Sequence, residues 1–338
     1  MSLGNLRDVT LAEARELAAD ARRLVRSGVN PIEARRIEKR GCPTFGKVSD
    51  ELLASKTSEW RNKKHREQWE RSLNVMASPL RDMPVHEIDT SHILAVLKPM
   101  WVEKQETASR LRQRLEAVLN AAKAKGYRSG ENPAAWRGHL AHLLPSKPRL
   151  AQQHHAAMDY KVVPKFMVQL YSEKTMAAYA LQFAILTAAR SGEVYGATWD
   201  EIDFDTAVWN LSAERMKSGR SHRVPISSHC LDLLRLVRKE RRGDYVFSGQ
   251  KKRQHLSHVS MAKVIKRLGV ENATPHGFRS SFRDYCGNET NFPREVAEAA
   301  LAHVIGDAAE QAYRRSDALD KRRALMEIWG KYCFSAFL

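Results

Sequence analysis

The stretch that decides the fold consists of two short motifs near the C-terminal end. The first is Thr274-Pro-His-Gly-Phe-Arg-Ser-Ser-Phe-Arg-Asp-Tyr285, and the second is Leu301-Ala-His-Val-Ile-Gly-Asp-Ala-Ala-Glu-Gln-Ala-Tyr-Arg-Arg-Ser-Asp317. His276 and Arg279 stand three apart just after a proline, where a helix is expected to begin, so one face of its first turn can carry both. In the second motif Tyr313 follows His303 by ten residues and has two arginines beside it. The two motifs thus bring histidine, arginine and tyrosine into one helical region.

These residue types are those that grip a phosphodiester and attack it with a phenol oxygen. Upstream, Thr187-Ala-Ala-Arg-Ser-Gly-Glu193 adds Arg190, and Met216-Lys-Ser-Gly219 adds Lys217. Arginine, lysine, His-x-x-Arg, histidine and tyrosine, in that order, resemble the catalytic domain of the tyrosine recombinases, and most of all prophage integrases. The resemblance implies a site-specific DNA recombinase that cleaves and rejoins DNA, to integrate or excise a mobile element.

Bulk composition points to a polyanionic partner. The 338 residues carry a formal net charge of +17 and allow two or three domains. The longest apolar run, residues 177–189, is interrupted by Gln182 and is too short to span a bilayer, so no membrane partner is expected. The four cysteines are scattered, which indicates neither a zinc site nor a disulfide framework and favours a reducing cytoplasm. We expect no cofactor and no metal.

Residues 5–40 are expected to form one amphipathic helix with a basic tail, capped by Thr10 or Asp8 and stopped at Gly28-Val-Asn-Pro31. This segment resembles the end of the arm-binding module of the integrases. In that family a strand-rich segment precedes the helix, and the printed sequence has none. We therefore expect residues 1–43 to be a remnant of the module with a linker, from a truncated or naturally shortened protein that lacks most of the arm-binding domain.

Residues 44–144 read as a helical domain, with helices expected at 45–56, 65–76, 90–97 and 106–125. Basic side chains recur in it and are expected to line one wall that lies along a DNA duplex; the candidates are Lys63, Lys64, Arg110, Arg112 and Arg114. The alternative for each is an ordinary solvated charge. The stretch from Trp60 to Trp69 and that from Glu106 to Arg114 resemble the core-binding domain of the family.

A polar, proline-bearing linker is expected over residues 145–157, followed by a catalytic domain over 158–338. Within it, Pro164 opens a helix and residues 176–190 form a nearly all-apolar buried one. Short alternating segments at 199–204, 208–211 and 223–226 predict a three-stranded antiparallel sheet, and helices return at 230–241, 258–268 and 318–332. The fold class is therefore mainly α with one small sheet.

The chemistry assigns a role to each candidate. Tyr313 attacks the scissile phosphate to give a 3′-phosphotyrosine, and Arg190 and Arg279 clamp its non-bridging oxygens without a metal. His303 donates a third bond to these oxygens, His276 assists proton transfer at the tyrosine, and Lys217 protonates the departing 5′ oxygen. The resemblance matches all six positions, and it implies that Glu193 orients the first arginine.

Each candidate also has a structural explanation. Arg190 ends an apolar helix and complements its dipole; Lys217 is a solvated turn charge; His276 and Arg279 form a helix N-terminal pair with Asp284; His303 is a satisfied helical histidine. As nucleophile, Tyr313 competes with Tyr285, Tyr160 and Tyr332. Two other functions stay open: a type IB topoisomerase-like enzyme that nicks and reseals DNA, and a non-catalytic DNA-binding regulator.

The expected partners are double-stranded attachment sites, on which the resemblance implies a homotetramer. A host DNA-bending protein and an excisionase are possible further partners. The C-terminal residues Tyr332-Cys-Phe-Ser-Ala-Phe-Leu338 form an apolar tail that packs either on its own domain or on a neighbouring protomer.

Overall fold

The computed structural model describes residues 7, 9–26, 30–32, 42–57, 60, 63–145, 156–249, 254–303 and 317–337. Its chain divides into two compact units, unit 1 over Met1–Leu150 and unit 2 over Ala151–Leu338. Both linkers expected from the sequence fall largely on residues 33–41 and 146–155, outside the described residues. Most described residues are helical and one small sheet is present, so the predicted fold class is confirmed.

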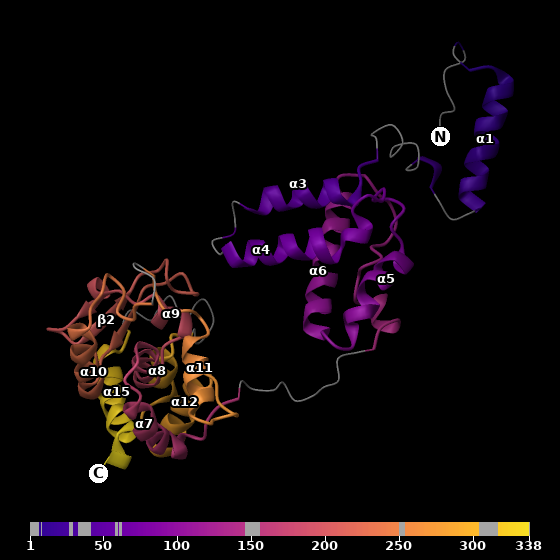
Figure 1. Cartoon of the computed structure of the whole chain (residues 1–338). Coiled ribbons are helices and arrows are strands. Elements are labelled where there is room, and N and C mark those ends of the chain that lie inside the picture. Colours follow the sequence, from indigo (N-terminus) through magenta and orange to yellow (C-terminus); the bar gives the residue numbers. More distant parts are fainter. Residues whose placement is uncertain are drawn as a thin grey trace. The chain divides into compact units, whose positions relative to one another are not determined.

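Unit 1 is built from helices (Figure 1). The long helices are α1 (Leu11–Arg26), α3 (Phe45–Thr57), α4 (Lys63–Arg71), α5 (Thr90–Trp101) and α6 (Gln105–Ala124). A π-helical turn, η1 (Ser72–Met76), continues α4, and the short turns η2 (Ser78–Leu80) and η3 (Leu140–His142) follow later. The four helices expected between residues 44 and 144 are therefore confirmed, with shifts of a few residues at their ends.

Local sequence signals set the ends of these helices. Thr10 caps α1, because the Glu13 backbone N–H donates to its hydroxyl at 3.3 Å while the Glu13 carboxylate accepts from the Thr10 backbone N–H at 2.8 Å. At the other end of unit 1, α6 stops where Gly126 takes a left-handed φ of 73°. The apolar face of α6 packs on α3 and α5 and buries Leu111, Leu115 and Val118 completely.

Unit 2 is organised around α8 (Met176–Thr187), whose residues from Ala178 onward are all buried. The longer helices that pack on it (Figure 1) are α7 (Val163–Ser172), α10 (Ser228–Lys239), α11 (Ser260–Arg267), α12 (Phe278–Glu289) and α15 (Leu319–Cys333). Gln182, the polar residue in this apolar run, donates its side-chain N–H to the Leu170 carbonyl at 3.3 Å. Such a bond offsets the cost of burying an amide.

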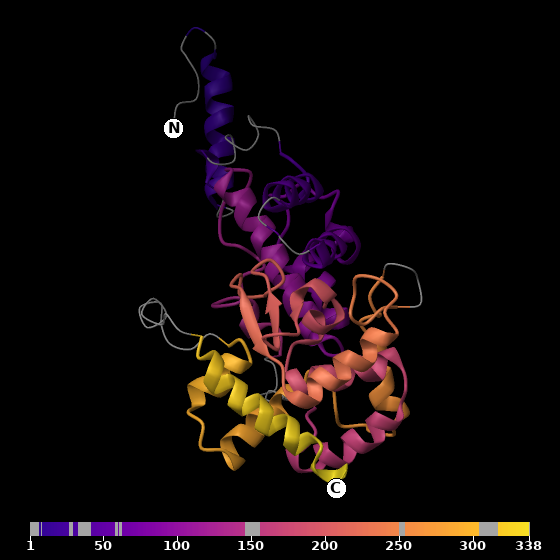
Figure 2. The ribbon, with the colours of Figure 1, turned by 90° about the vertical axis from the view of Figure 1, so that its left-hand side faces the viewer.

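The remaining elements connect and flank this bundle. They are η4 (Tyr160–Val162), α9 (Ser191–Tyr195), η5 (Trp199–Glu201), α13 (Arg294–Ala300) and η6 (Ser335–Phe337). Three antiparallel strands in the order β1 (Ile202–Asp203), β2 (Val208–Leu211) and β3 (His222–Pro225) form the sheet beside the helices (Figure 2). In the β2–β3 register Leu211 pairs with His222, so the intervening loop leaves from the end of the sheet.

The apolar C-terminal tail lies on its own unit. The Trp329 indole N–H donates to the Ile185 carbonyl at 2.8 Å and fixes α15 against α8. Beyond α15, the ring of Phe334 stacks on His229 at 4.6 Å, and Phe337 meets Tyr171 edge-on at 5.3 Å. Of the two alternatives for the tail, this structure shows the packing within one chain.

Candidate active site

Arg190 stands at the start of a helix rather than at the end of one. The sequence predicted a helix through Arg190, but α8 ends at Thr187 because Ala188 adopts a left-handed φ of 50°. The chain then turns, and Arg190 becomes the residue before α9. A positive side chain opposes the dipole there, so the helix-dipole explanation of Arg190 is wrong.

Glu193 fixes the Arg190 side chain. Its carboxylate accepts from the Arg190 backbone N–H at 2.8 Å and from the guanidinium at 2.9 Å, and Glu193 is buried. The other guanidinium nitrogen donates to the Ala302 carbonyl at 3.3 Å. With 24% of its side chain exposed, Arg190 is held from both sides and still reaches solvent.

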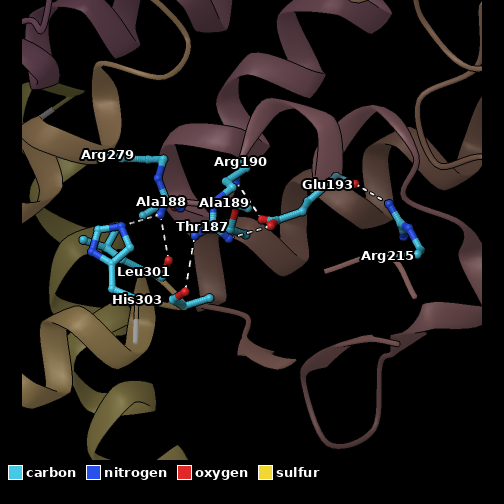
Figure 3. A network of polar contacts seen from close by, with 10 residues as sticks. Thr187, Ala188, Ala189, Arg190, Glu193, Arg215, Arg279, Leu301 and His303 are labelled. Atoms are coloured by element: carbon cyan, nitrogen blue, oxygen red, sulfur yellow. Dashed lines mark hydrogen bonds and ion pairs between the residues drawn. The ribbon is translucent and has the colours of Figure 1, made fainter. Parts of the chain in front are cut away.

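Arg279 lies beside this pair, deeply buried on α12 (Figure 3). Its guanidinium donates to the carbonyl oxygens of Ala188 and Leu301, the latter at 2.7 Å, and lies 3.2 Å from His303 Nε2. Burial and the charge of Arg190 lower the pKa of Arg279 to about 10. An anion bound between the two arginines would relieve this repulsion.

His303 completes the cluster from the turn after α13. Its Nδ1 lies 2.6 Å from a Glu298 carboxylate oxygen, so Nδ1 carries the proton and Nε2 faces Arg279. Arg283 donates to the other Glu298 oxygen at 2.7 Å. Burial alone would raise the pKa of Glu298, but the bonds from Arg283 and His303 outweigh it and lower that pKa. His303 therefore lies just after a turn, not in a helix as its structural explanation required.

Lys217 and His276 occupy two turns, and both are exposed. Lys217 lies in the β2–β3 loop, where Gly219 takes a φ of 69° and donates its N–H to the Met216 carbonyl at 3.0 Å. His276 lies in the turn before α12, which begins at Phe278 rather than at the predicted proline. Gly277 is required in that turn, because a Cβ there would lie 2.2 Å from the Ala156 carbonyl oxygen.

Tyr313 and the arginines beside it lie outside the described residues, which resume at Asp317. There the Asp317 carboxylate accepts bonds at 2.9 Å from Arg223, on β3, and from the buried Arg322. Glu298 holds His303 at the other side of the gap, so both flanks of the tyrosine segment are anchored.

The competing tyrosines serve as packing groups. Tyr285 is 5% exposed and stacks on Tyr332 at 4.3 Å, and burial raises its pKa to about 12. Tyr160 joins the same cluster and donates its hydroxyl to Glu289 at 2.7 Å. A phenol that is hard to ionise and hard to reach is a poor nucleophile.

His222 was missed in the sequence. It follows the lysine loop on β3, hydrogen-bonds the Ala300 carbonyl and is largely buried, which together with the charge of Arg322 lowers its pKa to about 4. The carbonyls of three successive residues, Ala300, Leu301 and Ala302, thus accept hydrogen bonds from His222, Arg279 and Arg190, in that order. The sequence signal was a histidine at a strand start, which the prediction placed one residue later.

The basic residues predicted in unit 1 divide into two groups. Lys64 and Arg110 are exposed, and Lys63 begins α4 with a side chain outside the described residues. Arg112 and Arg114 are buried, so their placement on a DNA-facing wall is wrong. Arg112 instead donates to Glu116 and the Ala134 carbonyl, and Arg114 donates to Ser72 and the Gln68 carbonyl.

Among the described residues, none of the helices has the length and apolar character needed to cross a membrane.

Three family profiles match successive parts of the chain. The phage integrase family matches residues 157–319, the phage integrase central domain matches 45–139, and an arm DNA-binding domain matches 1–38. An arm-binding module is thus represented in the chain. Relatives in sequence include the integrase of Enterobacteria phage P4, which is 29% identical over 96% of this chain and 77% of its own length. Prophage integrase IntA of Escherichia coli K12 is also 29% identical, over 97% and 80%.

Solved structures agree on the fold. A lambda integrase dimer bound to a COC′ core site aligns with a TM-score of 0.65 and 19% identity, over 94% of this chain and 89% of that one. The Tn1549 transposon integrase in complex with circular intermediate DNA aligns with a TM-score of 0.61 and 16% identity, over 84% and 99%.

Proposed function

The chain belongs to the phage integrase family of site-specific tyrosine recombinases, and we propose that Tyr313 is its nucleophile. The Tyr313 phenol oxygen attacks the scissile phosphorus while the bond to the 5′ oxygen breaks. A 3′-phosphotyrosine and a free 5′ hydroxyl result. Attack by the 5′ hydroxyl of another strand reverses these steps, so phosphodiester bonds are conserved and two duplexes exchange strands through a Holliday junction.

One observation carries the proposal: Arg279 is buried next to Arg190 and His303, with carbonyl groups rather than a carboxylate as its partners among the described residues. Arg190 has the Glu193 carboxylate as a partner but Arg279 has none among the described residues, so the pair keeps a positive charge and forms an electrostatic site for an anion. The transition state of phosphoryl transfer gathers charge on its non-bridging oxygens. Arginine donors placed beforehand stabilise that charge and need no metal ion.

Lys217 and His276 supply the proton transfers in this proposal. The departing 5′ oxygen needs a proton, and the ammonium of Lys217 on its exposed turn can donate it. His276 accepts or relays the proton of the Tyr313 phenol. Glu193 holds the first arginine in its working orientation through the two bonds described above.

Residues 44–144 form the core-type DNA-binding domain in this proposal, and residues 158–338 the catalytic domain. Lys63, Lys64 and Arg110 contact phosphates of the duplex. Trp60, His65 and Trp69 form an aromatic cluster beside the first two of them, with ring centroids 5.1–6.4 Å apart. Rigid aromatic packing next to a basic helix start favours a fixed orientation of the phosphate contacts.

The active assembly is proposed to be a homotetramer on two attachment sites in the bacterial cytoplasm. Lambda integrase, a structural neighbour, has been solved as a tetramer bound to a Holliday junction. A host DNA-bending protein and an excisionase would then select between integration and excision.

The test is a nicked suicide substrate, from which the short fragment with the free 5′ hydroxyl diffuses away after cleavage. Its sequence is taken from the chromosome flanking the gene. We expect a covalent protein–DNA band with the wild type in the presence of chelator, none with Tyr313→Phe, and a band with the matched control Tyr285→Phe. A band that persists in Tyr313→Phe would contradict the assignment of the nucleophile. Loss of the wild-type band on chelation would contradict metal independence.

A further inference from the structure

Arg215 joins the loop that carries Lys217 to the helix that carries Glu193. It stands two residues before the lysine, and 24% of its side chain is exposed. Its guanidinium donates to both carboxylate oxygens of Glu201 and to the Glu193 backbone carbonyl, the last at 2.6 Å. Figure 3 shows the contact with Glu193, on the opposite side from the arginine–histidine cluster.

Glu201, whose carboxylate accepts from Arg215, is itself held in place. Glu201 is 12% exposed and also accepts from the indole N–H of the fully buried Trp209 at 2.9 Å. Gly196 leaves room for the arginine, because a Cβ there would lie 2.7 Å from the guanidinium. The Arg215 guanidinium is therefore held by groups from η5 and α9, and Trp209 of β2 fixes the carboxylate of η5 that accepts from it.

Among the described residues, none makes a comparable side-chain contact with Lys217 itself. Lys217 and the three residues after it are exposed, whereas Met216 before it is buried. Arg215 and Met216 are thus the anchored residues next to Lys217. The contacts of Arg215 fix the position of the loop backbone relative to α9. A side chain that must donate a proton to one particular oxygen does so faster when its backbone is already held in position.

We propose that Arg215 is a positioning residue for proton donation by Lys217, an inference that rests on the function proposed above. In the attack step the bond from Tyr313 to phosphorus forms, the bond from phosphorus to the 5′ oxygen breaks, and Lys217 gives that oxygen its proton. Arg215 touches none of the reacting atoms. Its contribution is confined to the step that needs the lysine.

Changing the leaving group of the substrate distinguishes this positioning role of Arg215 from a purely structural role of its ion pair. A substrate with sulfur in place of the bridging 5′ oxygen leaves as a thiolate, whose conjugate acid has a pKa of roughly 8.5 and so needs no proton donor. Variants that affect only proton donation should recover on this substrate, while variants that impair phosphate binding or folding should not.

The experiment measures single-turnover cleavage of both substrates by the full chain. We expect Arg215→Ala to be slowed roughly 10- to 100-fold on the oxygen substrate, which is less than the roughly 10²–10⁴-fold contribution of a general acid itself, and to approach the wild type on the sulfur substrate. Lys217→Ala should behave in the same way with a larger defect, and Arg190→Ala should be slow on both. Glu201→Gln keeps the shape of the acceptor and should show a smaller defect that is also rescued.

Equal slowing of Arg215→Ala on the two substrates would overturn the proposal, because the arginine would then act through α9 and Arg190 or through folding. An unchanged rate on the oxygen substrate would overturn it as well. If Arg215→Ala does not fold, as judged by its thermal transition, the same comparison with Glu201→Gln decides. A wild type that cleaves neither substrate would instead overturn the proposed function and, with it, this inference.

Discussion

Arginines are buried in both units, and Arg112 and Arg114 of unit 1 are neutralised differently from Arg279 of unit 2. In unit 1, Arg112 pairs with the Glu116 carboxylate and Arg114 lies over the Trp69 ring with a hydroxyl and a carbonyl as acceptors. In unit 2, Arg279 has two carbonyls and a histidine and faces the positive charge of Arg190. The first arrangement holds helices together, whereas the second leaves charge available for a ligand.

The difference shows that burial of an arginine does not identify a functional site. Convergence does: Arg190 and Arg279 come from different elements and donate to the carbonyls of Ala302 and Leu301, directly before His303. Two of these three residues are oriented by a carboxylate outside the cluster, Arg190 by Glu193 and His303 by Glu298. In the buried ion pair of unit 1, Arg112 and Glu116 neutralise each other, so the pair offers no charge to a ligand.

The largest effect is expected for Arg279. Replacing it with alanine removes donors aimed at the transition state, and single-turnover cleavage should fall by about 10²–10³-fold or more. Arg279→Lys keeps a charge but loses the planar fork, so most of the loss should remain. If Arg279→Lys cleaved at the wild-type rate, charge alone would suffice and the geometric account would be wrong.

The opposite pattern is expected for Arg112 in unit 1. Arg112→Met fills a similar volume but gives up the bonds to Glu116 and Ala134, which should cost about 1–3 kcal/mol in the free energy of unfolding measured with urea. Cleavage per folded molecule at saturating DNA should stay near the wild type. A cleavage defect as large as that of Arg279→Lys would remove the distinction between the two units.

A pH-dependent stability difference is expected from His222. Its pKa of about 4 in the folded protein lies below the ordinary 6.5, so the unfolded chain binds the proton first as pH falls. The stability of the wild type should therefore drop from pH 6.5 toward pH 4 by up to about 3 kcal/mol on account of this group. His222→Gln should lack this part of the drop in urea unfolding, and an identical pH profile would contradict the buried neutral histidine.

The smallest effects are expected for the exposed bases of unit 1. Lys64→Ala and Arg110→Ala should each weaken DNA binding several-fold regardless of sequence, and each should reduce the salt dependence of the binding constant by about one ion. Fluorescence titration at several salt concentrations measures both quantities. An unchanged salt slope would remove these residues from the DNA interface.

Much of the fold was predictable because local patterns and tertiary packing agree in it. The amphipathic helices of unit 1, the apolar α8 and the strands β2 and β3 all carry their periodicity in the sequence. The first strand, predicted over 199–204, was only partly right, because η5 occupies 199–201 and β1 only 202–203. The end of α8 was not predictable. Nothing in the sequence shows that Ala188 takes a left-handed φ. This conformation ends the helix, and the Ala188 carbonyl accepts a hydrogen bond from Arg279.

The site was predictable as a set of residue types and less so as a geometry. The order of motifs selected Arg190, Arg279 and His303, which the structure brings together. Glu298 and His222, which contact these residues or the segment between them, match no motif in the sequence. Their roles show only in contacts with residues distant in sequence or in a turn. In unit 1 the sequence could not separate exposed from buried arginines, because it gives the spacing on α6 but not the face that packs.

The central claim, that Arg190 and Arg279 act on the non-bridging oxygens of one phosphate, has a direct test. A methylphosphonate at the scissile position replaces one charged oxygen with a methyl group and removes the charge the arginines neutralise. Arg279→Ala, strongly impaired on the phosphodiester, should regain formation of the covalent complex on the methylphosphonate. The same deficit on both substrates would contradict the claim and leave Arg279 as a structural residue.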